Sequence, residues 1–189
     1  GWSFFGGIDK RFNDRHLLSL VAFATPTENG RQGASVAEMI NIAGDNFYNP
    51  LWGYQNGKKR NSSVASTFQP VFILTHDWKV NDKTSLVTAG SYIFGKRSVT
   101  GLDWYNSADP RPDYYRYLPS YQLDPNFAAQ QLDAMKNDIN LRQVNWDRLY
   151  NVNYGNIATV NDVNGISGND VTGKRSLYIV EDRIVNTNR

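Results

Sequence analysis

The sequence predicts an all-β chain of antiparallel hairpins, with short helices inserted in long polar loops. Two separate regions alternate apolar and polar residues with period two, and each region reverses at a short polar turn. The chain has 21 Asn and 15 Asp but only 3 Glu. Asn and Asp favour turns because their side chains bond the local backbone, whereas Glu is the commoner acid in helices. Since 13% of the residues are also aromatic, the composition favours strands and loops over helices.

Two hairpins are predicted, the first over residues 1–24 and the second over residues 64–101. The first reverses at the polar run Asn13-Asp14-Arg15-His16, and its returning strand ends before Pro26. The second reverses at the similar run Asn81-Asp82-Lys83-Thr84. In both, apolar side chains recur at every second position, which is typical of strands with one buried and one polar face.

The first long loop is predicted over residues 25–63. It contains one short helix, predicted over residues 35–42, with Ser35 as its N-cap and Glu38 at the third helical position. Gly44 follows this helix and is a suitable terminating residue.

The second long loop is predicted over residues 102–181. Its clearest helix covers residues 125–137, because Asp124 is a good N-cap and Pro125 suits the first helical position. A second helix is predicted over residues 141–152. The Gly- and Asn-rich segment 155–174 has no periodicity and is predicted to be mobile, and residues 182–189 begin a further strand.

The order of these elements alternates short turns with long loops. Transmembrane β-barrels have this asymmetry, and their strands need about 9–11 residues to cross the bilayer. Aromatic residues near the predicted strand ends fit the girdles of such barrels; they are Trp2, Phe12, Phe68, Trp78, Tyr92 and Phe94. A soluble β-sandwich or meander would alternate in the same way, so the pattern alone leaves both architectures open.

Three stretches of sequence carry a resemblance to a known family. They are Ala22-Phe23-Ala24-Thr25-Pro26 followed by residues 48–62 (YNPLWGYQNGKKRNS), residues 102–119 (LDWYNSADPRPDYYRYLP) and residues 143–150 (QVNWDRLY). In this order they resemble TonB-dependent outer-membrane receptors of the Bacteroidetes type, which include SusC-like proteins. The resemblance implies a barrel of about 22 strands with a plugged lumen. This chain would supply four strands and the start of a fifth, as an internal segment of a partial transmembrane β-barrel, with its long loops extracellular.

The resemblance also implies partners and a role in active nutrient uptake. The partners are the remainder of the barrel and its plug, the TonB complex acting through an N-terminal part outside this chain, outer-membrane lipid, and a surface lipoprotein as in SusC-like relatives. The nutrient would be a glycan, a peptide or a siderophore. We also expect the isolated segment to self-associate, because its open sheet edges are templates for pairing. The alternative function is a soluble, secreted, β-rich ligand- or carbohydrate-binding module.

Aromatic side chains in the predicted loops are the candidate ligand-binding residues. Flat rings with polar tips suit wet, concave sites, and an arginine suits an anionic group. The candidates are Trp52, Tyr54, Trp104, Tyr105, Arg111, Tyr114, Tyr115 and Tyr117. The competing interpretation is that these residues pack the long loops against one another.

Composition and spacing argue against other classes of function. A net charge of +2 is too small to favour nucleic acid, and the absence of cysteine excludes thiolate metal sites and a cysteine nucleophile. The run from Asp162 departs from the EF-hand pattern, with Gly165 at position four and Gly173 at position twelve. No G-x-S-x-G sequence is present. We therefore predict no metal, no cofactor and no enzymatic activity. We also expect an excerpt of a longer protein, because no export signal precedes the first strand.

Overall fold

The computed structural model describes all of residues 1–189 and is mostly β, with 46% of residues in strands against 22% in helices. The strand pairs are antiparallel. The chain divides into two compact units. We call residues 1–29, 64–99 and 182–189 the sheet unit, and residues 30–63 and 100–181 the loop unit. None of the helices combines the length and the apolar composition that a membrane-spanning helix needs.

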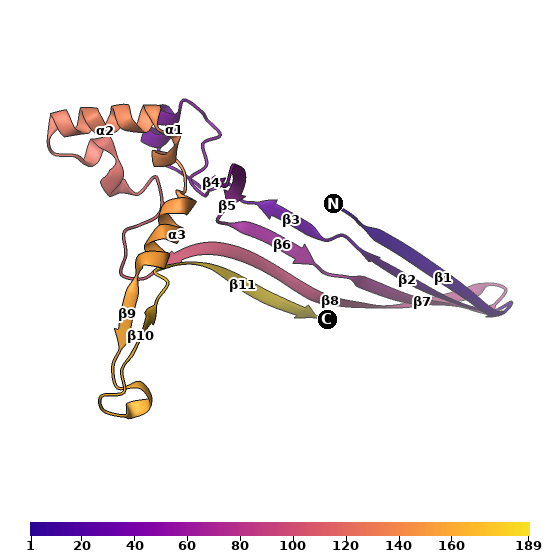
Figure 1. The fold of residues 1–189 in the computed structure, drawn as a ribbon. Helices are drawn as coiled ribbons and strands as arrows, with labels where there is room; N and C mark the ends of the chain where they lie inside the picture. The colour runs from indigo at the N-terminus through magenta and orange to yellow at the C-terminus, as the bar shows by residue number, and fades with distance from the viewer. The chain divides into compact units, whose positions relative to one another are not determined.

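The sheet unit is built on one antiparallel sheet, whose strands run side by side in Figure 1. Its main path is β1 (Phe4–Asn13), β2 (His16–Ala24), β7 (Val71–Asn81) and β8 (Thr84–Trp104), and β11 (Tyr178–Asn188) also pairs with β8. The short strands β6 (Val64–Phe68) and β3 (Thr27–Gly30) extend the sheet: β6 pairs with β8, and β3 pairs with β6.

Both tight turns of this sheet are stabilised by an asparagine side chain. The Asn13 carboxamide oxygen accepts hydrogen bonds from the backbone N–H groups of Arg15 (2.9 Å) and His16 (3.0 Å). The Asn81 oxygen accepts one from the backbone N–H of Lys83 (2.9 Å). A short side chain that imitates a backbone turn is the local reason why the strands reverse at these positions.

The second hairpin contains an interruption that the alternating pattern does not reveal. Residues 64–81 are divided at Gln69–Pro70, although β6 and β7 pair with β8 in one continuous register. Proline has no N–H to donate to the ladder, and the Pro70 carbonyl accepts instead from the N–H of Phe94 (3.3 Å). Gly95 lies opposite with φ 124°, and a Cβ at this position would collide with the Phe68 carbonyl oxygen.

The loop unit holds the helices, namely α1 (Ala37–Ala43), α2 (Pro125–Asn137) and α3 (Trp146–Gly155). It also contains two small hairpins, β4 (Trp52–Gln55) with β5 (Lys58–Asn61) and β9 (Ile157–Val160) with β10 (Val171–Lys174). Single 3-10 turns are η1 (Tyr115–Tyr117), η2 (Pro119–Tyr121), η3 (Ile139–Leu141) and η4 (Val163–Gly165). The unit has two small apolar cores. One is formed by Met39, Ile42, Leu118 and Met135, and the other by Val144, Trp146, Leu149 and Tyr178.

The predicted helix starts differ in how well they match the structure. Asp124 caps α2 as predicted, because its side chain accepts from the N–H groups of Asn126 and Phe127. The prediction for α1 is wrong in its cap: Val36 is the N-cap without a side-chain bond, and the Ser35 hydroxyl donates to Asp113 (3.1 Å). The last helix begins at Trp146 rather than at residue 141, because the Asn145 side chain caps it.

Within segment 155–174, β9 and β10 pair as a hairpin, which the lack of sequence periodicity does not reveal. The β-branched residues Ile157, Val160 and Val171 lie in β9 and β10, where such side chains suit a strand. The Thr159 and Thr172 hydroxyls bond across the pair at 2.8 Å. The β4–β5 hairpin was also not predicted, although Asn56-Gly57 is a strong hairpin signal and both residues have positive φ, 50° and 74°.

Replacing Gly53 tests the close contact between the β4–β5 hairpin and the Val144 backbone. Gly53 is buried, the Trp52 carbonyl accepts from the Val144 N–H (3.0 Å), and a Cβ on Gly53 would collide with the Val144 carbonyl. We expect Gly53→Ala to lower the free energy of unfolding of the chain by about 1–3 kcal/mol, as overpacking does. Urea denaturation measures this change. The matched control is Gly101→Ala, whose Cβ would meet nothing within 4 Å. An equal effect of the two substitutions would contradict the assigned contact.

Candidate functional site

One face of the sheet is mainly apolar. Residues directly opposite in an antiparallel pair share a face, and the rows Ile8–Leu20–Leu74 and Ala22–Phe72–Tyr92 follow from the register. We define the apolar face by Phe4, Ile8, Leu18, Leu20, Ala22, Phe72, Leu74, Trp78, Leu86 and Tyr92, and the same register also places Lys10, His16, His76 and Thr88 on it. No second layer covers it: Ile8 is 68% exposed, Leu74 48% and Leu86 50%.

The opposite face mixes charged, hydroxyl and apolar side chains. Its rows include Asp9–Ser19–Thr75 and Arg11–Leu17–Asp77. We call it the mixed face, and define it by Phe5, Asp9, Arg11, Leu17, Ser19, Val21, Phe23, Val71, Ile73, Thr75, Asp77, Lys79, Val87, Ala89, Ser91 and Ile93. This face is also open, so the sheet unit has one apolar surface, one mixed surface and almost no core of its own. Ala24 is its one buried hydrophobic residue.

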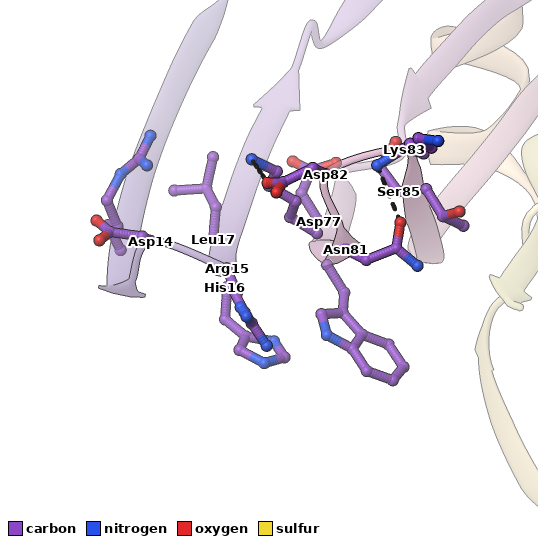
Figure 2. Close-up of a pocket in the computed structure, with 13 residues that line it drawn as sticks. Asp14, Arg15, His16, Leu17, Asp77, Asn81, Asp82, Lys83 and Ser85 are labelled. Carbon is purple, nitrogen blue, oxygen red and sulfur yellow. Dashed lines mark hydrogen bonds and ion pairs between the residues drawn. The ribbon is translucent and has the colours of Figure 1, made fainter.

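An open hollow of about 560 Å³ lies at the turn end of the sheet (Figure 2). Figure 2 shows charged residues around the two turns, among them Asp14, Arg15 and Asp82. The Lys79 ammonium forms an ion pair with the Asp82 carboxylate at 3.0 Å. Both partners of this pair are well exposed, so the pair contributes little stability. Acidic and basic side chains alternate around this hollow, so it has no excess of one charge that would select a charged ligand.

The two histidines of the chain meet on the apolar face near the turns. His16 Nδ1 and His76 Nε2 are 3.0 Å apart and their rings stack, and the Trp78 ring stacks on His16 at 5.7 Å between centroids. No group of three or more His, Cys, Asp or Glu side chains could hold a metal ion. In the β9–β10 loop, the Asp162 and Asp170 carboxylates accept backbone N–H groups, so both help to hold the loop together.

The structure brings five of the eight predicted ligand-binding residues together in the loop unit. The Arg111 guanidinium lies 5.3 Å from the Trp104 ring and 5.8 Å from the Tyr114 ring. Tyr114 in turn contacts Tyr115 and Tyr117, with ring centroids 4.7 Å and 5.3 Å apart. Trp104 also packs against the apolar core that contains Trp146, so this member of the cluster has a structural role.

The other three predicted residues lie apart from this cluster. Trp52 and Tyr54 form a T-shaped pair in the β4–β5 hairpin, and the Lys59 ammonium lies 4.0 Å from the Trp52 ring. Tyr105 follows the end of β8, where its N–H donates to the Leu177 carbonyl, and its side chain is 45% exposed.

A cavity of about 220 Å³ adjoins the cluster, and two members of the cluster, Arg111 and Tyr117, line it. The remaining lining residues come from α2, α3 and the segments beside them. They are Asp109, Pro110, Pro112, Gln131, Met135, Asn140, Leu141, Gln143, Asn145, Arg148 and Leu149. We call it the Gln143 cavity. Its wall is fixed by local bonds: Arg111 Nε donates to both Asp109 carboxylate oxygens (2.9 and 3.1 Å), and the Tyr117 hydroxyl donates to the Asp109 carbonyl (2.8 Å).

Polar groups of the Gln143 cavity are incompletely paired. Gln143 is only 5% exposed, and its Nε2 donates to Asn140 Oδ1 (3.3 Å), but its Oε1 has no partner. Burial raises the pKa of the Tyr117 hydroxyl above its ordinary value, and the nearby positive charge of Arg148 opposes this rise. The Asp109 hydrogen bond raises the pKa of Arg111, so this guanidinium stays charged.

A half-buried polar cluster consists of Tyr48, Asp113 and Arg142. Burial and the negative charge of Asp113 both raise the pKa of Tyr48, and the positive charge of Arg142 lowers it. Burial raises the pKa of Asp113 above its usual 3.8, and the Ser35 hydroxyl opposes this by donating a hydrogen bond. The Tyr48 hydroxyl and Arg142 Nε have no partner. These groups lie beside the first apolar core, against which Tyr48 packs.

Sequence reasoning missed Gln143 and Arg148 as site residues. The run from Gln143 to Tyr150 was noted only as part of a resemblance. Its placement beside Asp109 and Arg111 depends on tertiary packing, for which the sequence has no local signal. No protein-family model, no curated protein and no solved structure matches this chain. The functional assignment therefore depends on the geometry described above.

The raised pKa of Asp113 predicts a pH-dependent gain on its replacement. A carboxyl whose folded pKa is raised contributes stability below its unfolded pKa and loses that contribution as the pH rises through the folded value. We therefore expect Asp113→Asn to be more stable than the parent chain at pH 7, with the gain vanishing near pH 3. Thermal unfolding at both pH values measures this. Asp133→Asn is the control, since Asp133 lies exposed on α2. A gain for Asp113→Asn that is equal at both pH values would contradict burial as the cause.

Proposed function

We propose that this chain is a segment of a TonB-dependent outer-membrane transporter, contributing barrel wall and extracellular ligand-mouth loops. The observation that carries the proposal is a single antiparallel sheet with one apolar and one mixed face, both open. In a barrel wall, the apolar face would contact lipid and the mixed face the lumen. The sheet unit buries too few apolar side chains to be stable in water, and a bilayer supplies the missing apolar environment.

Strand length and aromatic placement support the same proposal. Strands β1, β2 and β7 have 10, 9 and 11 residues, which fits the length needed to cross the hydrocarbon layer at a tilt. On the apolar face Trp78 lies near the turns, whereas Phe72, Tyr92 and Phe94 stack near the other end with centroids 5.6–5.8 Å apart. Aromatic residues at both ends of the strands match the girdles of a barrel.

Chain connectivity accounts for the loops. The strands are joined alternately by tight turns at residues 14–15 and 82–83 and by the long excursions that form the loop unit. In outer-membrane barrels, short turns are periplasmic and long loops extracellular. The loop unit would then form part of the ligand mouth. The plug, the remaining strands, the TonB complex and a surface lipoprotein would be the partners, and the nutrient a glycan, a peptide or a siderophore.

Lipid-phase quenching at two adjacent positions of β7 tests this proposal. Leu74 belongs to the apolar face and Thr75 to the mixed face, and this chain has no native cysteine. Leu74→Cys and Thr75→Cys are each labelled with bimane in the protein produced from its complete gene, and reconstituted with spin-labelled phospholipid. We expect quenching several-fold stronger at position 74 than at position 75.

Two results would overturn the barrel assignment. Equal quenching at the two positions would mean that the faces do not meet different environments. No quenching at position 74, together with recovery of the protein from the soluble fraction, would favour the soluble, secreted binding module instead.

A further inference from the structure

We propose that His16 and His76 form a pH-sensitive switch between β2 and β7: the pair holds the turn ends of these strands together through one shared proton, and protonation of both rings separates them. Both histidines belong to the sheet unit, so the inference does not depend on a membrane. In the barrel of the proposed function, the switch would lie at the periplasmic end of the wall.

The first argument is that the two ring nitrogens face each other directly. His16 Nδ1 and His76 Nε2 are 3.0 Å apart, which is a hydrogen-bond distance, and the planes of the two rings differ by only 9°. The ring centroids are 5.3 Å apart, which is close to the N···N distance plus the two distances from centroid to nitrogen. The two nitrogens therefore lie on the line between the ring centres.

The second argument is the number of protons that this bond can hold. A neutral imidazole has one N–H and one acceptor nitrogen, whereas an imidazolium has two N–H groups and no acceptor. With one proton between the nitrogens, one ring donates to the other, and the donating ring can be neutral or charged. When both rings are charged, two N–H groups face each other, so the bond is lost and two positive charges repel each other.

The third argument is that nothing beside the pair offsets two charges. The register from β1 to β8 places no Asp or Glu on the apolar face, and near the pair it adds the cation Lys10, opposite Leu18. Asp9 and Asp77 lie on the mixed face. The turn residues balance in charge, Asp14 with Arg15 and Asp82 with Lys83. Two imidazolium rings would therefore remain uncompensated on an apolar surface, where charge is costly.

The pair lies next to the backbone hydrogen bond that joins β2 and β7 at the turns. His16 is opposite Trp78 in the register, and the N–H of the next residue, Lys79, donates to the Arg15 carbonyl (2.8 Å). The bonded pair holds one proton fewer than two free imidazolium rings, so acid favours the separated form. Since imidazole groups gain their proton near about pH 6.5 in model peptides, we expect the separation between about pH 6 and about pH 5.

Hydrogen exchange of the full chain in detergent micelles tests the proposal at two backbone N–H groups. Protection factors are used because they correct for the intrinsic pH dependence of exchange. For the Lys79 N–H we expect protection to fall by up to about tenfold per pH unit between about pH 6 and about pH 5, as a difference of one bound proton requires. The Ile93 N–H donates to the Arg189 carbonyl (2.8 Å), at the other end of the β7–β8 pair, and its protection should stay constant.

Two variants and one control assign this effect to the pair. His76→Gln and, separately, His16→Gln each leave one ring opposite a carboxamide, which can donate or accept. The remaining ring then gains its proton without a second imidazolium beside it, so we expect Lys79 protection to be independent of pH over this range. Lys10→Gln is the control, because it removes the neighbouring cation and retains both rings, and the acid-dependent loss should persist.

The shared proton itself is detectable by NMR in the chain labelled with 15N-histidine, which contains only these two histidines. We expect a 15N–15N coupling across the N–H···N bond near neutral pH and its loss in acid. Four results would overturn the proposal: no coupling near neutral pH, constant Lys79 protection in the parent chain, a fall of equal size in both Gln variants, or an equal fall at Ile93.

These outcomes are separate from the lipid-quenching result. Acid-dependent exchange at Lys79 without lipid contact at position 74 would retain the switch and reject the barrel. Lipid contact at position 74 with pH-independent exchange at Lys79 would retain only the barrel.

Discussion

Antiparallel backbone pairing is the interaction on which the sheet unit depends. Strands β1, β2, β7 and β8 form one series of antiparallel pairs, which joins the backbone donors and acceptors of neighbouring strands, and β1 forms an open edge of the sheet. Side-chain burial adds little, because both faces are open and Ala24 alone of the hydrophobic residues is buried. Hydrogen bonding contributes little net stability in water but is obligatory in hydrocarbon. This balance is what the proposed barrel wall requires, provided that further strands pair with the open edges of the sheet.

The loop unit is stabilised in a different way. Two small apolar cores and a set of side-chain caps hold its helices and hairpins. Contacts distant in sequence then place polar groups beside these cores. Val144 packs in one core and donates its N–H to the Trp52 carbonyl, and the preceding residue Gln143 is thereby held in a buried position. The unpaired acceptor of the cavity is a consequence of this packing.

How much of the structure can be predicted depends on how local each signal is. Asn13 and Asn81 set the turns and Asp124 caps α2, and each acts on the backbone two or three residues away. The hairpin signal of Asn56-Gly57 is equally local, so the β4–β5 turn can also be predicted from the sequence. The break at Pro70 was hidden because the alternating pattern continues across it.

The candidate site shows the same division. Arg111 and Tyr117 were predicted from residue type, because loop arginine and tyrosine suit ligands. Gln143 and Arg148 were not, because their role depends on segments about 30 residues apart coming together around one cavity. The separation of the sheet into an apolar and a mixed face follows from the alternation of the strands. The register that aligns these faces across four strands is visible only in the structure.

We propose that the strands cross an outer membrane, with the tight turns periplasmic and the long loops extracellular. The most direct test is labelling with a maleimide too large to cross that membrane, applied to intact cells carrying Lys83→Cys or Ser167→Cys. These positions lie in the turn between β7 and β8 and in the β9–β10 loop. We expect labelling at position 167 on intact cells, and at position 83 only after the outer membrane is opened. Labelling of both positions on intact cells, or of position 83 alone, would contradict it.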